Sequence, residues 1–88
     1  MKCFVSREYN TAPVILNQIQ EVLDKLKIQY FDMYSQDYGA DISSGVIKLI
    51  SNAEIVIGVV TRNSTNVFYE IGVAVGMGKR GFFFFYDF

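Results

Sequence analysis

Apolar residues follow two alternating patterns along the chain, and the alternation predicts the order of the secondary-structure elements. Four short apolar runs are typical of strands: residues 2–6, 28–34, 54–61 and 81–87. In the segments between them, apolar residues recur at the spacing of one helix face: Ile15, Ile19, Val22, Leu23 and Leu26, then Ile42, Val46, Leu49 and Ile50, and finally Val67, Ile71, Ala74 and Val75. The pattern predicts the order βαβαβαβ within one domain that spans residues 1–88.

The third apolar run, EIVIGVVT over residues 54–61, shows no alternation of polar and apolar positions. Strands of this kind lie inside parallel sheets, where helices cover both faces. The crossovers between such strands are right-handed. The sequence therefore predicts an α/β fold of the flavodoxin-like kind, a three-layer αβα sandwich around a four-stranded parallel sheet in the order 2-1-3-4.

Two glycines, Gly72 and Gly76, lie within the third helical segment. Each costs about 1 kcal/mol relative to alanine in the interior of a helix. We expect a close approach of this helix to the sheet to compensate for that cost.

The last predicted strand, GFFFFYD, is the most aromatic segment, and the sequence ends just after it at Phe88. An exposed hydrophobic edge strand favours pairing with another strand. Either the natural chain continues beyond this strand or a second copy covers it. We favour self-association and expect a homodimer or a higher homo-oligomer.

The composition excludes several classes of function. The 51% of hydrophobic residues excludes a disordered chain. Eight basic against nine acidic residues give a net charge of -1, which leaves no basic excess for a nucleic-acid partner. The chain has no histidine, so histidine-dependent triads and most zinc sites are excluded, and we expect no metal site.

The cellular compartment follows from the single cysteine and from the lengths of the apolar runs. Cys3 has no partner for an intrachain disulfide, which favours a reducing compartment. No apolar stretch approaches the roughly 20 residues that span a bilayer, and the N-terminus lacks a signal sequence. We therefore expect a cytoplasmic protein without a membrane partner.

Candidate binding residues lie in the two loops that follow the first and third strands. Ligands of open parallel sheets bind beyond the carboxyl ends of the strands, where neighbouring connections diverge to opposite faces. Both loops are rich in hydrogen-bonding groups, as a sugar or phosphate site requires; the candidates are Ser6, Arg7, Tyr9, Asn63 and Asn66. The alternatives are a surface salt bridge for Arg7, ordinary packing for Tyr9 and a helix cap for Asn66.

Glu70 is the candidate catalytic residue. It lies near the start of the third helix, beside the apolar stripe, where the helix dipole favours its ionised form. A charged carboxylate in a cleft can act as a nucleophile or stabilise the positive charge that develops at an anomeric carbon. The alternative is a structural glutamate that bonds back to the free NH groups near Asn66.

Residues 47–79, about a third of the chain, resemble the nucleoside 2-deoxyribosyltransferase-like and TIR-like superfamily. In that group a helix ends in a dipeptide of the A-D type, and an apolar strand and a polar loop follow. A segment N-V-x-x-E-hydrophobic-G-x-A and a G-K pair complete the pattern. The matching pieces here are N-A-E at residues 52–54, N-V-F-Y-E-I-G-V-A at residues 66–74 and G-K at residues 78–79.

The resemblance implies cleavage or transfer at an N-glycosidic bond of a nucleoside or nucleotide, with Glu70 as the catalytic carboxylate and no cofactor beyond NAD as a substrate. In the deoxyribosyltransferases the preceding loop reads Asp-x-Gly-Thr, and its Asp assists the nucleobase. Residues 64–67 here read S-T-N-V, which favours an NAD-cleaving TIR-like enzyme or a non-catalytic nucleotide-sensing or assembly module. Asp37 and Asp41 are candidates for the missing acid.

Overall fold

The computed structural model describes residues 1–35, 42–62 and 64–85. Its elements follow one another as β1 (Lys2–Ser6), α1 (Pro13–Lys25), β2 (Gln29–Phe31), a 3-10 turn η1 (Met33–Ser35), α2 (Ile42–Ser51), β3 (Ile55–Val60), α3 (Thr65–Gly76) and β4 (Arg80–Phe85). The predicted order βαβαβαβ is confirmed.

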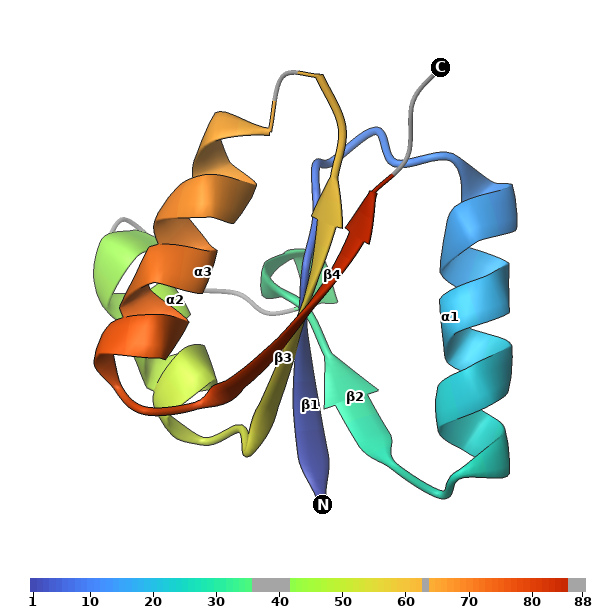
Figure 1. Ribbon diagram of the computed structural model, residues 1–88, viewed down its shortest axis with the longest axis horizontal. Helices are drawn as coiled ribbons and strands as arrows, with labels where there is room; N and C mark the ends of the chain where they lie inside the picture. The colour runs from blue at the N-terminus through green and yellow to red at the C-terminus, as the bar shows by residue number, and fades with distance from the viewer. Residues whose placement is uncertain (36–41, 63, 86–88) are drawn as a thin grey trace.

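The four strands form one parallel sheet in the order β2-β1-β3-β4. Helix α1 covers one face of the sheet, and α2 and α3 cover the other (Figure 1). The flavodoxin-like three-layer architecture and the strand order 2-1-3-4 are therefore confirmed. The carboxyl ends of β1 and β3 are adjacent, since Ser6 pairs with Gly58.

Side chains of β1 alternate between the two faces of the sheet, as the pleat of a strand requires. Phe4 belongs to the buried cluster under α2 and α3, whereas Cys3 and Val5 belong to the cluster under α1. Ser6 has the same parity as Phe4, so its side chain points to the face that α3 covers. This parity brings a buried hydroxyl under the third helix.

The close approach between helix and sheet occurs at a glycine of the strand. A Cβ atom on Gly58 would lie 2.7 Å from Cδ1 of Ile71, so only glycine leaves room for α3 there. Around Gly72 and Gly76 no heavy atom lies within 4 Å of a built Cβ. The expectation that these two helix glycines mark the close approach is therefore wrong.

The second strand is shorter than its apolar run. The run predicts a strand over residues 28–34, but β2 ends at Phe31. The carboxylate of Asp32 accepts a hydrogen bond of 2.9 Å from the backbone NH of Tyr34 and so turns the chain into η1. Aspartate commonly makes such bonds two residues ahead, which competes with the sheet.

The buried stripe of α3 also differs from its apolar pattern. Val75 is 65% exposed, and the buried residues of the helix are Val67, Glu70, Ile71 and Ala74. A glutamate therefore occupies a core position. In α1, Val22 is likewise exposed, and Ile15, Ile19 and Leu23 form the covered face.

Candidate functional site

The site is built around a hydrogen bond between the end of β1 and the middle of α3. The hydroxyl of Ser6 donates to Oε1 of Glu70 at 2.5 Å, and both residues are buried. The strand pleat points Ser6 toward α3, and the helical period places Glu70 beside Val67 and Ile71 on the face that contacts the sheet. The two periodicities together produce the contact.

Burial controls the acidity of Glu70. Removal from water raises the pKa of Glu70, the hydrogen bond from Ser6 opposes this, and the negative charge of Glu8 raises the pKa further. The expectation that the helix dipole favours its ionised form is wrong, because Glu70 is the sixth residue of α3 and the dipole acts within the first turn. The described partner of the carboxylate is Ser6 rather than a free helix NH group.

Glu8 adds a second carboxylate to the loop that follows β1. Its backbone carbonyl accepts hydrogen bonds from the NH and the hydroxyl of Thr11, at 3.2 and 2.7 Å, and from Nη1 of Arg7 at 3.1 Å. Its side-chain oxygen Oε1 is buried and has no hydrogen-bond partner among the described residues. Glu8 is not among the residues that the sequence pattern predicts for the site, and its place two residues after Ser6 is the signal that could have indicated it.

Arg7 connects the loops around Glu70. Its Nε forms an ion pair of 3.0 Å with Asp32, and its guanidinium lies 4.7 Å from the ring centre of Tyr34. Its backbone carbonyl accepts hydrogen bonds from the hydroxyl of Tyr34 and the side-chain amide of Asn66, at 3.1 and 3.4 Å. The salt-bridge alternative is thus the one observed, and Arg7 positions its neighbours.

The residue at the N-cap of α3 is Ser64 and not Asn66. Ser64 is the N-cap residue, and Asn66 lies inside the helix, so the assignment of Asn66 as the cap is wrong. The hydroxyl of Ser64 accepts a 2.6 Å hydrogen bond from the NH of Thr61 and donates one of 3.0 Å to its carbonyl. The remaining candidates Asn63, Asp37 and Asp41 lie outside the described residues.

Two tyrosines border the site. Tyr9 is 79% exposed and packs edge-on against Tyr34, with ring centres 5.4 Å apart. Burial raises the pKa of the Tyr34 hydroxyl, and the charges of Glu70 and Glu8 raise it further. The exposed ring of Tyr9 offers a flat aromatic surface at the edge of the site.

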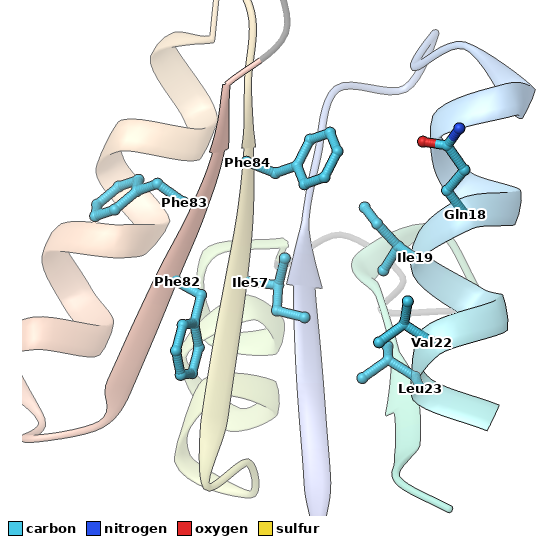
Figure 2. A pocket seen from close by; sticks show the side chains of 8 residues that line it. All are labelled: Gln18, Ile19, Val22, Leu23, Ile57, Phe82, Phe83 and Phe84. Carbon is cyan, nitrogen blue, oxygen red and sulfur yellow. The ribbon is translucent and has the colours of Figure 1, made fainter. Parts of the chain in front are cut away.

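Two cavities in the described part of the chain lie away from Glu70. The larger, of about 340 Å³, is an apolar groove between α1 and β4, lined by residues such as Ile19, Val22 and Phe84 (Figure 2). The smaller, of about 190 Å³, lies against α1 and β2 and includes Arg7 and Asp32. Glu70 lines neither, because Ser6 and the packing of α3 enclose it.

We also searched the described residues for a metal site, a membrane-spanning helix and a reactive cysteine. Within them, no group of three cysteine, aspartate or glutamate side chains could hold a metal ion. None of the helices described is both long enough and apolar enough to cross a membrane. Burial raises the pKa of the Cys3 thiol to about 11, so this cysteine is a core residue and a poor nucleophile.

Comparison with known proteins identifies the fold. Neither a protein-family model nor a curated protein matches the sequence. Among solved structures, the chain is similar to the 2-deoxyribosyltransferase of the psychrotolerant bacterium Bacillus psychrosaccharolyticus, with a TM-score of 0.79 and 15% identity. The match covers 97% of this chain and 72% of that one. The chain therefore has the fold of a nucleoside 2-deoxyribosyltransferase.

Proposed function

We propose that the protein binds a nucleoside or nucleotide at the carboxyl ends of β1 and β3 and cleaves or transfers it at the N-glycosidic bond. The observation that carries the proposal is the buried hydrogen bond between Ser6 and Glu70. It holds a carboxylate beside the crevice in which ligands of such sheets bind. The deoxyribosyltransferase-like fold supports the same chemistry.

In this proposal Glu70 attacks the anomeric carbon as the base departs. A carboxylate suits this step, because the transition state carries oxocarbenium character. Ser6 orients the carboxylate through the hydrogen bond to Oε1. Only the ionised form attacks, so the raised pKa of Glu70 makes the reaction faster at higher pH until ionisation is complete.

The remaining candidate residues take binding roles. Tyr9 offers its exposed ring to a base, and the amide of Asn66 lies at the start of α3 beside the crevice. Arg7 is engaged with Asp32 and holds the loop in place. Asn63 belongs to the same loop in the sequence.

NAD is the first substrate that we propose, and 2′-deoxynucleosides are the second. The nicotinamide of NAD leaves as a neutral molecule without receiving a proton, whereas a neutral nucleobase requires one. Ser64 stands where the resemblance places a base-assisting acid, and its hydroxyl is engaged with Thr61. A site that lacks an acid there favours the substrate that needs none.

The test is product release by the wild type and by Glu70→Gln. The protein is incubated with NAD or with 2′-deoxyadenosine, and released nicotinamide or adenine is measured by liquid chromatography. We expect release by the wild type and a loss of at least 100-fold in Glu70→Gln, which keeps the shape and removes the charge. Glu21→Gln, at an exposed residue of α1, is the matched control.

A nucleotide-sensing or assembly module is the second candidate function. The observation that favours it is the burial of Glu70, whose hydrogen bond to Ser6 satisfies it as a structural residue. Binding of NAD in calorimetry without release of nicotinamide would support the sensor. Absence of both binding and release would contradict both functions.

Self-association through β4 is part of the proposal. The four phenylalanines of this edge strand are all exposed: Phe82 57%, Phe83 48%, Phe84 38% and Phe85 74%. Their side chains alternate between the two faces of the sheet, and together they expose roughly 400 Å² of apolar surface along this edge. A second copy paired along β4 would cover this surface. A stable interface buries about 800 Å² per partner, and the apolar groove beside α1 adds to the area available for it (Figure 2).

A further inference from the structure

One buried atom of the site lacks a partner. Oε1 of Glu8 is buried, and no described group forms a hydrogen bond with it. A buried carboxylate oxygen without a partner destabilises the folded state, so folded proteins seldom keep one without a use. The atom is free to receive a proton or a hydrogen bond from a bound molecule.

Glu8 belongs to the loop that contacts α3 around Glu70. Ser6, two residues earlier, donates a hydrogen bond to Glu70, and the backbone carbonyl of Arg7, the residue before Glu8, accepts one from the side-chain amide of Asn66. The charge of Glu8 raises the pKa of Glu70, which agrees with this placement. Three hydrogen bonds to the backbone carbonyl of Glu8, from Thr11 and Arg7, fix the loop that carries it. Glu8 is therefore a second acid held in a defined position.

The neighbouring polar groups are already engaged. Asp32 accepts hydrogen bonds from Arg7 and from the backbone of Tyr34. The hydroxyl of Tyr34 donates to the carbonyl of Arg7, and that of Ser6 donates to Glu70. Oε1 of Glu8, by contrast, has no partner among the described groups and can accept a hydrogen bond from a substrate or water.

We infer that Glu8 is the general base that removes the proton from the water which releases the sugar from Glu70. The inference rests on the proposed function, in which a carboxylate oxygen of Glu70 bonds to the anomeric carbon. It adds a catalytic residue for the second half of that reaction. Two carboxylates with separate roles are the usual arrangement for glycosidic cleavage with retention.

With NAD as the substrate, the proposed reaction has two steps, the formation and the hydrolysis of a bond between C1′ and Glu70. In the first, Glu70 forms a bond to C1′, the C1′–N bond breaks, and its electron pair neutralises the nicotinamide ring. In the second, water attacks C1′ and gives its proton to Oε1 of Glu8, and the bond from C1′ to Glu70 breaks with its electron pair returning to the Glu70 carboxylate. The first step needs no proton, so Glu8 acts only in the second.

The experiment uses Glu8→Ala and Glu8→Gln with NAD and with nicotinamide 2′-deoxyriboside, both of which release neutral nicotinamide. In rapid-quench measurements we expect each variant to release one equivalent per site at nearly the wild-type rate. Steady-state turnover then falls by about 100-fold or more, as for loss of a general base. Mass spectrometry should find the sugar adduct on Glu70.

Azide tests the role of Glu8 directly. Azide is a nucleophile that needs no deprotonation, so it should raise the turnover of Glu8→Ala and yield a glycosyl azide with the configuration of the substrate. Water-dependent turnover of Glu21→Gln, at an exposed residue, should stay within threefold of the wild type. Circular dichroism and thermal unfolding of Glu8→Gln monitor folding.

Two outcomes would overturn the inference while the proposed function stands. One is steady-state turnover of the folded Glu8 variants within threefold of the wild type. The other is an equal loss of first-turnover release and steady-state turnover without an azide response. Failure of the wild type to release nicotinamide or adenine from any substrate would overturn the proposed function and the inference together.

Discussion

The hydroxyl of Ser6 at the end of β1 donates a 2.5 Å hydrogen bond to the carboxylate of Glu70 in the middle of α3, 64 residues further along the chain. Both residues are buried. The bond therefore fixes the helix over the strand and opposes the effect of burial on the acid. The same hydrogen bond therefore contributes to the packing of α3 on the sheet and to the proposed chemistry of Glu70.

Replacement of Ser6 tests this coupling. Ser6→Ala removes the hydrogen bond that lowers the pKa of Glu70, so this pKa should rise further, and the pH at which activity reaches half its maximum should rise with it. The free energy of unfolding should fall by about 1–3 kcal/mol, because a buried acceptor loses its donor. A pH–rate profile and urea unfolding measure the two effects.

Thr65→Ala, at an exposed residue of the same helix, is the control for Ser6→Ala. It should leave the pH profile in place. An unchanged profile in Ser6→Ala would show that the hydrogen bond does not act on Glu70.

The pH dependence of stability reports on Glu70 itself. Because its pKa is raised from 4.5 on folding, the folded protein binds the proton more tightly, and this group's contribution to stability is present at low pH and is lost as the pH rises through the folded pKa. Glu70→Gln has no charge to bury. Relative to the wild type, its free energy of unfolding should therefore increase as the pH rises from 4.5 toward 8.

Urea unfolding of the two proteins at several pH values measures this difference. Glu21→Gln, which alters an exposed ion pair, should show a nearly constant difference from the wild type over the same range. A constant difference for Glu70→Gln as well would contradict the burial of an ionisable Glu70.

Gly58 provides a test of the close packing of α3. In Gly58→Ala the new methyl would meet Ile71, so the free energy of unfolding should fall by about 1–3 kcal/mol. Addition of Ile71→Val removes the contacting Cδ1 and should restore part of the loss. Gly72→Ala, in open space on the helix, should instead raise stability by about 1 kcal/mol. Thermal and urea unfolding distinguish these effects.

The opposite order, with Gly58→Ala neutral and Gly72→Ala destabilising, would place the close approach in the helix, as the sequence alone suggested.

A substitution that introduces one charge on β4 tests self-association through this strand. The wild type should sediment as a dimer at high micromolar concentration, and Phe85→Lys should shift it to the monomer by placing a charge on the apolar edge. Phe68→Lys alters an equally large side chain that is 55% exposed on α3, and should leave the dimer intact. A monomeric wild type at that concentration would contradict the proposed dimer.

Local patterns were enough to predict the fold. The spacing of apolar residues separated strands from helices, and the apolar run of β3 indicated a parallel sheet covered on both faces. The pattern overestimated the length of β2, because the turn at Asp32 depends on a side-chain hydrogen bond that hydropathy does not represent. The position of Glu70 near the start of a helix predicted a carboxylate that is favoured in its ionised form, whereas burial raises its pKa.

The sequence by itself determined the order of the elements, the parallel sheet and the candidate acid, since these depend on neighbours a few residues apart. Tertiary structure decided that Ser6 meets Glu70 and that Arg7 pairs with Asp32, contacts that depend on strand register and helix position. It also decided the acidity of Glu70 and the unpartnered oxygen of Glu8. Desolvation and hydrogen-bond satisfaction depend on every surrounding atom, and folding brings those atoms together from distant parts of the chain.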